Sequence, residues 1–579
     1  MHHADDPPRL KDRLVVDTVA EGLLELLEVR GVKYFFGGGA GTDFPPFIEA
    51  FAKRAAHGRT GGLRPITVSH EITAVAMAHG YAMVTGEPQA VMVHTIAGTA
   101  NALGGLINAT RARVPMLLTA GRTPITEMGH PTSRGQGIHW AQESFDQAGM
   151  VREFVKWDYE LRRGEQLETV VDRALAITRN APAGPVYLTL PLDVVGDRLS
   201  PLDYSCTPRL QPSSPTRPEP ASLQYAAHVL ARATNPLVVT SSLGRDPEAV
   251  GALVTLAERL AIPVVESWAS HLSFPQDHPL HQGFDVGALL GTADVVIAIE
   301  TDTPWFPKDA QPPEDATVIQ IDDDPLYEGY PIRGFPTDIG LAGCPRSTLV
   351  ALDAALDLTN PDPDVVESRR QRWTADHVRR RAAWKEKGDG VSHDAPLDYQ
   401  WISRCIGDTL SPDDIAVTEI SLDRTQVSFT QPGTFFNHAH SAVLGWGPGA
   451  ALGAKLACPD RTVVCAIGDG SHVFGVPTAT HLLSRAYDLP VLFVIYNNGG
   501  WQRTRDATRA YAPDGWATRQ PSMPLCELKP SPRFELICEA NGGYGELVDD
   551  PSELPAALAR ALDVVKHDKR QALLNVIAK

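Results

Sequence analysis

The sequence predicts an α/β protein with three doubly wound parallel-sheet domains. Short runs of β-branched and apolar residues, typical of buried parallel strands, alternate with helical patterns along the 579-residue chain. The chain is too long for one hydrophobic core, since a domain commonly holds about 150 residues. Two linkers separate the groups of elements: a Pro/Ser-rich stretch at 200–220 and TNPDPD at 359–364. We therefore expect domains at 13–198, 221–358 and 395–579.

Composition and charge narrow the functional class. The chain is 43% hydrophobic and 21% charged, as in ordinary soluble globular proteins. Acidic residues outnumber basic ones, 70 to 52, and the net charge of −18 argues against a nucleic-acid partner. The seven cysteines form no Cys-x-x-Cys pair, so we expect neither a disulfide framework nor a zinc site. With no secretion signal and no apolar run long enough to span a membrane, the sequence favours a cytoplasmic protein without a membrane partner.

The first predicted domain begins with an amphipathic helix pattern, VAEGLLELLEVRGV, at residues 19–32. KYFF follows as a strand, and GGGAGTDF at 37–44 follows as a glycine-rich loop. Further strands are predicted at PITVSH, QAVMVHT, VPMLLTAG and GPVYLTLP, with helices between them. This alternation predicts a parallel sheet with helices on both faces.

The second predicted domain repeats the alternation, with strands at PLVVT, IPVVES, ADVVIAIET and ATVIQID. Its turn Ser242-Leu243-Gly244 has one glycine, so the sequence lacks a dinucleotide fingerprint. A charged helix, VVESRRQRWTADHVRRRAAWKEK at 365–387, follows. We expect its arginine run to form a solvated helix face, with a phosphate-binding patch as the alternative.

The third predicted domain contains a strand–loop–helix–strand unit at residues 462–500. TVVCAI is the first buried strand; Gly-Asp-Gly follows it, a loop begins at Ser471, and a helix starts near Pro477. VLFVIY is the second strand and ends in Asn-Asn-Gly-Gly. Because adjacent parallel strands place their carboxyl ends at one edge of a sheet, both polar clusters are expected to border one ligand site.

The atom types in this unit suit an anion and a hard cation. Glycines beside a helix N-terminus let backbone N–H groups approach an anion. Carboxylate and amide oxygens suit Mg²⁺ or Ca²⁺ rather than zinc. The alternative interpretation is a tight strand-to-helix turn followed by an Asn-Gly turn, with no ligand.

The unit resembles the cofactor motif of thiamine diphosphate enzymes, in which Gly-Asp-Gly is followed by a spacer and Asn-Asn. The resemblance implies that Asp469 and Asn498 bind Mg²⁺ through their side chains and that Gly500 binds it through its carbonyl oxygen. The spacer is slightly longer than in many decarboxylases, so Asn497 is the alternative to Asn498. The residues implied at the diphosphate are Gly468, Gly470, Ser471 and Asn498.

A second segment, SHEITAVAMAHGYAMVTG at residues 69–86, predicts a buried helix that begins with Glu71, because almost every later residue is small or apolar. One interpretation of Glu71 is a first-turn carboxylate that balances the helix dipole. The segment also resembles the His-Glu … Gly-Tyr-Ala … Thr-Gly signature of the acetolactate synthase and benzoylformate decarboxylase branch. The resemblance implies that Glu71 keeps a proton on the cofactor's pyrimidine ring and so primes its amine to deprotonate the thiazolium carbon.

Other segments of the first domain extend the resemblance. GGGAGTDF lies where relatives carry a proline-containing loop over the pyrimidine, which implies contacts from Gly38 and Gly39, although this chain lacks the proline. HTIAGTANALGG places His94 where a relative's histidine acts as an acid or base, a role that suits an ordinary histidine pKa near about 6.5. The alternative is a histidine with a purely structural role, whose ring nitrogens are hydrogen-bonded at the end of a strand. The same segment implies that Asn101 lies at the cofactor.

Three further positions follow from the resemblance. HSAVLGWGPG places Leu444 at the large apolar residue beneath the cofactor that bends its two rings together; the alternative is an ordinary core leucine. Gln142 and Glu143 align with a Gln-Glu pair near the substrate in acetolactate synthases. Three histidines are additional candidates for contact with substrate, with surface positions as the alternative: His139, His438 and His472.

The resemblance extends from about Val15 to the C-terminus and implies pyrimidine-binding, central and diphosphate-binding domains in that order. It implies thiamine diphosphate and Mg²⁺ as cofactors, and a homodimer or homotetramer with active sites between subunits. FAD is not expected, because the central domain shows no flavin-contacting segment. The reaction that the resemblance favours is 2-oxo acid decarboxylation with carboligation of the resulting enamine to a second carbonyl compound, an aldehyde or ketone. Two alternatives stay open: a decarboxylase that releases an aldehyde, and a catalytically inactive regulatory protein.

Overall fold

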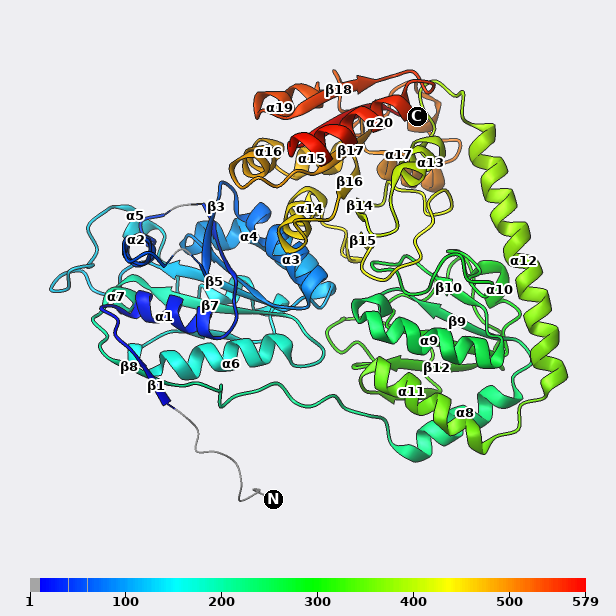
Figure 1. Ribbon diagram of the computed structural model, residues 1–579, viewed down its shortest axis with the longest axis horizontal. Helices are drawn as coiled ribbons and strands as arrows, with labels where there is room; N and C mark the ends of the chain where they lie inside the picture. The colour runs from blue at the N-terminus through cyan, green and yellow to red at the C-terminus, as the bar shows by residue number, and fades with distance from the viewer. Residues whose placement is uncertain (1–10, 40, 60) are drawn as a thin grey trace. The chain divides into compact units, whose positions relative to one another are not determined.

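A computed structural model gives the fold of residues 11–39, 41–59 and 61–579 (Figure 1). The chain forms two units. The first contains the residues up to Ser213 together with two later segments, Ala439–Ala457 and Gly475–Leu483. The second contains the remaining segments, Ser214–His438, Cys458–Phe474 and Ser484–Lys579. One parallel sheet in the first unit and two in the second confirm the predicted α/β fold class.

The first sheet has the strand order β3-β2-β4-β5-β7-β6, and every neighbouring pair is parallel. Five of its strands coincide with predicted ones, whereas β6 was not predicted because three residues are too few to show a periodic pattern. The strands are β2 (Tyr34–Gly38), β3 (Arg64–Val68), β4 (Gln89–Val93), β5 (Met116–Arg122), β6 (Asp158–Glu160) and β7 (Pro185–Pro191). The main helices around them are α1 (Val19–Val29), α2 (Pro45–Ala56), α3 (Glu71–Thr85), α4 (Thr95–Arg111) and α6 (Leu167–Arg179). An antiparallel pair, β1 (Lys11–Leu14) and β8 (Leu202–Ser205), accompanies this sheet.

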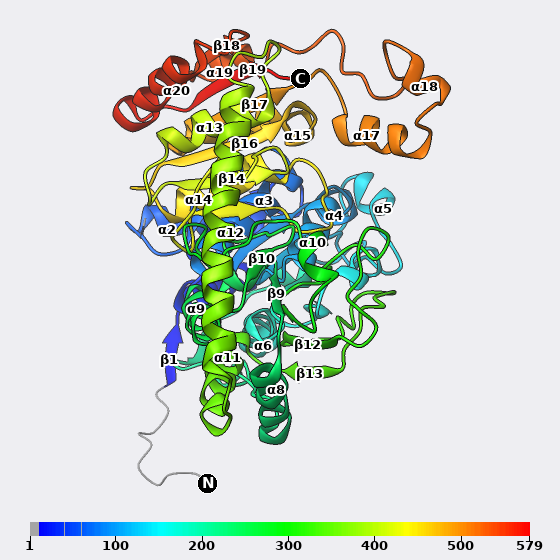
Figure 2. The ribbon, with the colours of Figure 1, turned by 90° about the vertical axis from the view of Figure 1, so that its right-hand side faces the viewer.

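The central sheet, drawn in green in Figure 1, is also wholly parallel, in the order β10-β9-β11-β12-β13. Its strands are β9 (Pro236–Thr240), β10 (Val264–Glu266), β11 (Val295–Ile299), β12 (Thr317–Asp322) and β13 (Ile339–Ala342). Its main helices are α8 (Pro220–Arg232), α9 (Pro247–Leu260) and α11 (Pro345–Ala355). The predicted charged helix is α12 (Pro363–Gly390), which Figure 2 shows as one uninterrupted helix. No helix of the described residues is both long and apolar enough to cross a bilayer.

The third sheet has the order β15-β14-β16-β17-β19-β18, and again all its neighbours are parallel. The strands are β14 (Ile415–Glu419), β15 (Phe435–Asn437), β16 (Val463–Gly468), β17 (Leu492–Asn497), β18 (Tyr544–Val548) and β19 (Ala572–Ile577). Helices in this part of the chain include α13 (Tyr399–Thr409), α15 (Asp469–Phe474), α16 (Pro477–Ala486), α17 (Gln502–Tyr511) and α20 (Leu554–Asp563). The pairing of β16 with β17 matches the predicted strand–helix–strand unit.

The first and third sheets share one topology. If the strands are numbered within each domain, both sheets have the order 2-1-3-4-6-5. The chain therefore changes direction across the sheet between β2 and β4 in one domain, and between β14 and β16 in the other. Open α/β sheets bind ligands at such switch points, beyond the carboxyl ends of the strands. The loops that follow these four strands therefore border the expected ligand sites.

Helix α14 (Trp446–Ala457) packs closely against α3 within the first unit. A Cβ atom on Gly453 would lie 2.0 Å from the Met77 carbonyl oxygen, and one on Gly80 would lie 2.1 Å from the Ala450 carbonyl oxygen. Only glycine leaves room for two helix backbones to approach so closely. This packing fixes α14, and the segment that precedes it, against the helix that begins with Glu71.

We predict that Gly453→Ala destabilises the protein by about 1–3 kcal/mol, because the added methyl group overpacks against backbone atoms that cannot move aside. Gly251 on α9 is the matched control, since a Cβ there meets no atom within 4 Å. Gly251→Ala should stabilise the protein by about 0.5–1 kcal/mol through reduced backbone entropy of the unfolded chain. Urea-unfolding midpoints measure both changes, and a Gly453→Ala protein as stable as wild type would contradict this packing.

Candidate functional site

Glu71 is the first residue of α3 and lies directly after the loop that follows β3. Its side chain is buried, and its Oε2 accepts a hydrogen bond of 3.2 Å from Asn101 Nδ2 on α4. Gly39 faces the other oxygen: a Cβ there would lie 3.0 Å from Glu71 Oε1, and Gly39 has a φ of +63°. A Cβ on Gly38 would lie 3.1 Å from the Glu71 Cα. The structure therefore brings together four predicted residues: Glu71, Gly38, Gly39 and Asn101.

His94 and Asp43 form a close pair beside this carboxylate. His94 caps the N-terminal end of α4, and its Nδ1 lies 2.5 Å from Asp43 Oδ1. The hydrogen bond from the imidazole to Asp43 raises the pKa of His94 above its ordinary value; burial opposes this shift, and Gln142 adds to it. Asp43 Oδ2 is buried and has no hydrogen-bond partner among the described residues. The buried carboxylate of Asp43 thus favours the protonated form of the His94 imidazole.

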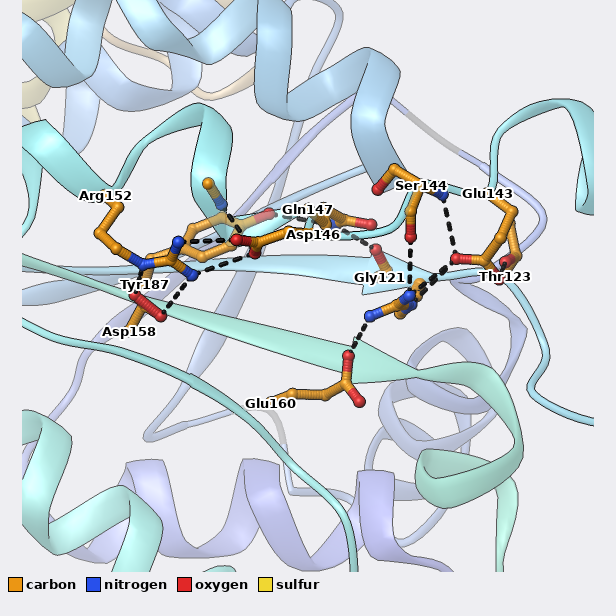
Figure 3. A network of polar contacts seen from close by, with 12 residues as sticks. Gly121, Thr123, Glu143, Ser144, Asp146, Gln147, Arg152, Asp158, Glu160 and Tyr187 are labelled. Atoms are coloured by element: carbon orange, nitrogen blue, oxygen red, sulfur yellow. Dashed lines mark hydrogen bonds and ion pairs between the residues drawn. The ribbon is translucent and has the colours of Figure 1, made fainter.

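Two glycines make room for the pair. A Cβ on Gly121 would lie 1.6 Å from Asp43 Oδ2, and a Cβ on Gly41 would lie 2.0 Å from His94 Nδ1. Gln147 donates hydrogen bonds to the Gly121 carbonyl oxygen (2.9 Å) and to the Tyr187 hydroxyl (3.0 Å), as Figure 3 shows. Gly121 is therefore held in the position that leaves space for the Asp43 carboxylate.

The two residues of the predicted Gln142–Glu143 pair have different hydrogen-bond partners. Gln142 Oε1 accepts a hydrogen bond of 3.1 Å from Thr95, the residue after His94. Glu143 instead receives hydrogen bonds from Thr123 Oγ1 (2.6 Å; Figure 3), from Arg122 Nη2 (2.9 Å) and from Arg134. Burial alone would raise the pKa of Glu143, but the hydrogen bonds from Thr123 and Arg122 outweigh it and lower that pKa. Gln142 is thus associated with the His94 pair, whereas Glu143 anchors its loop.

The three candidate histidines are not on the surface. His139, His438 and His472 are 7%, 4% and 0% exposed, so the alternative of surface positions is wrong for each. His139 Nε2 lies 3.4 Å from Thr42 Oγ1, in the loop that carries Asp43, and burial lowers the pKa of His139. Each is buried although its side chain is polar, because it lies in a segment that packs against the protein core.

Asp469 begins helix α15, where the sequence predicted a loop from Ser471. An acidic residue at a helix N-terminus favours the helix, which is why the segment Asp469–Phe474 does not remain a loop. Asp469 Oδ1 accepts a hydrogen bond of 2.8 Å from the Gly470 amide, and Oδ2 accepts one of 3.0 Å from the Gly500 amide. Burial raises the pKa of Asp469, and these amide hydrogen bonds oppose the shift.

The two asparagines after β17 differ in their contacts. Asn497 is buried; it donates to Asn575 Oδ1 (2.9 Å) and accepts from Ser531 Oγ (3.0 Å) and the Gly499 amide (3.2 Å). Asn498 donates to the Tyr399 hydroxyl (2.5 Å), and its Oδ1 is reached only at 3.5 Å, by Arg505 Nη1. Asn498 is therefore the asparagine whose amide oxygen is available to a ligand.

The donor set after β16 and β17 fits a hard cation. The side-chain oxygens of Asp469 and Asn498 and the carbonyl oxygen of Gly500 are all of the type that Mg²⁺ prefers. The described residues hold no group of three or more His, Cys, Asp or Glu side chains that could bind a metal. With one carboxylate, the set needs a further anion to balance a divalent cation, and a diphosphate supplies it. Gly468 and the buried Ser471 flank Asp469.

Leu444 belongs to the first unit and follows a segment fixed by Asn108 on α4. Asn108 Nδ2 donates to the Val443 carbonyl oxygen (2.8 Å), and its Oδ1 accepts from Ser441 Oγ (2.8 Å). Leu444 itself is half-buried rather than sealed in the core. This partial exposure favours a contact with a ligand over the alternative of an ordinary core leucine.

The sequence did not single out Asp43, Arg505 or Tyr399. Asp43 is the one acidic residue in the sequence of the glycine-rich loop after β2, and this was the only feature of the sequence that could have marked it as a candidate site residue. Its pairing with His94 depends on β2 and β4 being neighbours in the sheet. Arg505 and Tyr399 lie on helices α17 and α13, which no local pattern connects with Asn498.

Comparison with known proteins gives matches to three domains of one family. The thiamine pyrophosphate enzyme N-terminal TPP-binding domain matches residues 17–150, the central domain matches 223–352, and the C-terminal TPP-binding domain matches 416–576. Benzoylformate decarboxylase of Pseudomonas aeruginosa is 28% identical over 532 residues, 88% of this chain and 92% of that protein. Acetolactate synthase isozyme 3 large subunit of Escherichia coli is 26% identical over 568 residues, 95% of this chain and 93% of that protein.

A solved structure shows the same fold. Benzoylformate decarboxylase from Polynucleobacter necessarius superposes with a TM-score of 0.76 at 22% identity, over 97% of this chain and 99% of that chain. At this identity the likeness concerns the fold alone.

We predict that Asp43→Asn lowers the pKa of His94, because the substitution removes the charge that opposes burial. The pKa of His94 is raised in the folded protein, so the pair stabilises the fold fully below the unfolded pKa of about 6.5 and loses that contribution as the pH rises through the folded pKa. The stability lost in Asp43→Asn should therefore be larger at acidic than at alkaline pH. NMR titration of the imidazole measures the pKa directly, with exposed Asp203→Asn as control. An unchanged His94 titration in Asp43→Asn would contradict the pairing.

Proposed function

Because this chain belongs to the thiamine pyrophosphate enzyme family, whose curated relatives include decarboxylases and synthases, we propose that it removes carbon dioxide from a 2-oxo acid with bound thiamine diphosphate and Mg²⁺. The observation that carries this proposal is the His94–Asp43 pair next to the buried Glu71, at the carboxyl ends of β2 and β4. In this arrangement His94, held by Asp43, can act as an acid at one atom, and the carboxylate of Glu71 can exchange a proton at another.

The Glu71 pocket is proposed to receive the pyrimidine ring of the cofactor. Thiamine diphosphate, when bound, supplies an acidic thiazolium carbon that attacks a carbonyl group and accepts the electron pair of the breaking carbon–carbon bond. Glu71 would share a proton with the far ring nitrogen, a role supported by its burial and by the one side-chain hydrogen bond that it receives among the described residues, from Asn101. Gly38 and Gly39 would border the ring, and Leu444 would support the cofactor.

The Asp469 cluster is proposed to hold Mg²⁺ and the diphosphate. Asp469, Asn498 and the Gly500 carbonyl bind the ion, an assignment supported by their oxygen-only chemistry. The hydrogen bonds that occupy Asn497 support Asn498 as the ligand. Gly468, Gly470 and Ser471, which lie next to Asp469 in the chain, would contact the diphosphate.

His94 is proposed to donate a proton to the carbon that loses carbon dioxide; release of the aldehyde would then require loss of the proton on its oxygen. The hydrogen bond to Asp43 keeps the imidazole protonated nearer neutral pH, and this supports His94 as an acid. Asp43 is a positioning residue in this account, since it acts through His94. Water then returns the proton to the imidazole.

A second candidate reaction is carboligation to an aldehyde or ketone, as in a synthase. Gln142 lies against Thr95, beside His94, where it can hold the oxygen of a second carbonyl compound. The 26% identity to an acetolactate synthase over 95% of the chain is consistent with this route. The two reactions share the loss of carbon dioxide and differ in whether a proton or a carbonyl carbon is then accepted.

We also propose that the enzyme is a homodimer or homotetramer. Large apolar side chains of the first unit are exposed in the single chain, among them Phe145, Met128 and Trp140. Exposed apolar side chains of this size are typical of surfaces that a second subunit covers.

A screen of 2-oxo acids tests the proposed function. Purified protein with thiamine diphosphate and Mg²⁺ should release carbon dioxide from at least one 2-oxo acid and form an aldehyde, or a ligated product once an acceptor aldehyde is added. Glu71→Gln is the matched variant: it should retain cofactor binding while the rate of carbon dioxide release falls by about a hundredfold or more. The same preparation should elute as a dimer or larger. Equal rates in Glu71→Gln and wild type would refute the role of Glu71, and no carbon dioxide from any 2-oxo acid would refute the function.

A further inference from the structure

A basic cavity lies in the second unit, away from the residues discussed above. It has a volume of about 440 Å³ and is an open pocket lined by α12, α13 and the loop 425–428 that follows β14. Helices α12 and α13 lie side by side in both views (Figures 1 and 2). Its charged lining residues are Arg381, Lys385, Arg404 and Asp408. The arginine run of α12 therefore presents part of its charge to a concave pocket rather than only to the convex surface of the helix.

The cations of this cavity outnumber its carboxylates. Asp408 binds only the Nε of Arg404, at 3.1 and 3.2 Å, and the terminal nitrogens of Arg404 have no partner among the described residues. Neither Arg381 nor Lys385 forms an ion pair or hydrogen bond with any residue that the structure describes. Burial lowers the pKa of Arg381; the charge of Asp277, which does not line the cavity, opposes this shift, and the nearby Arg404 adds to it. The lining thus carries three positive charges against one negative charge, within a chain of net charge −18.

The walls of the cavity are fixed by buried contacts. Gln426 Nε2 donates a hydrogen bond of 2.8 Å to the Trp384 carbonyl oxygen, which ties the loop to α12. Gly388 makes this approach possible, because a Cβ there would lie 2.1 Å from Gln426 Oε1. Two residues before Gln426, Arg424 turns inward and binds the buried Glu266 at 2.5 Å. The loop is therefore held from two sides, and the cavity is preformed.

We propose that this cavity binds the phosphoryl group of a small phosphorylated metabolite. The net charge of two matches a phosphate dianion, and the terminal nitrogens of two guanidinium groups supply the donors that phosphate oxygens accept. The volume exceeds that needed for phosphate alone and falls in the range of small-molecule sites, about 300–1,000 Å³. A carboxylate ligand would leave part of the charge unbalanced.

Titration with inorganic phosphate tests the site in the full-length protein saturated with thiamine diphosphate and Mg²⁺, so that any cofactor site is already filled. Ionic strength is held constant with chloride, and binding is followed by calorimetry and by the unfolding temperature. Phosphate should bind and raise the unfolding temperature. Arg381→Gln and Lys385→Gln should each weaken phosphate binding by about tenfold, because each removes one charge-assisted contact. Lys387→Gln and Arg379→Gln, which remove the same charge outside the cavity, should change it by less than about twofold.

Three outcomes would overturn the proposal. Phosphate that binds no better than chloride would show that the cavity has no affinity for it. Equal losses of phosphate affinity in Lys387→Gln and Lys385→Gln would show that phosphate responds to the overall positive charge of α12 and not to a specific site. Citrate binding more tightly than phosphate would exclude the phosphoryl class. Because Lys385 is exposed, its variant keeps the test valid even if Arg381→Gln does not fold.

Discussion

Burying a carboxylate costs free energy unless donors or cations meet it, and Glu71, Asp43 and Asp469 are all buried in segments that follow parallel strands. Each has a different compensation: the amide of Asn101, the imidazole of His94, or a pair of backbone N–H groups. The rest of the fold, from the strand order to the glycine contacts, serves to hold these three groups where the strands end.

The repeated strand order explains why the polar residues of both halves lie at equivalent places. In the first sheet the switch point lies between β2 and β4, where Gly39 and His94 follow the strands. In the third sheet it lies between β14 and β16, and Asp469 follows β16. The close contact of α14 with α3 adds a later segment of the chain to the first unit, and Leu444 is positioned with it. Glycines allow the close approach of α14 to α3, just as they leave room for the carboxylates in the loops after the strands.

The sequence predicted the parts of the fold that local pattern determines. The β-branched runs around Gly468 and Asn497 are β16 and β17, and the small-residue run after Glu71 is the buried helix α3. The sequence could not predict contacts that depend on sheet order, such as the pairing of Asp43 with His94 across 51 residues. A lone aspartate in a glycine-rich loop has the composition of an ordinary turn. The same limit applies to the cavity at Arg381, because the arginine pattern of α12 alone cannot show which side chains a neighbouring loop encloses.

The dependence of cofactor binding on magnesium tests the central claim most directly. Because Asp469 at the N-terminus of α15 is proposed to hold the ion, thiamine diphosphate titrated calorimetrically into wild type should bind with Mg²⁺ and bind at least about tenfold more weakly in excess chelator. Asp469→Ala should bind it weakly under both conditions, while an exposed substitution such as Asp563→Ala should behave as wild type. Thiamine diphosphate affinity that is equal with and without Mg²⁺, or unchanged in Asp469→Ala, would contradict the account.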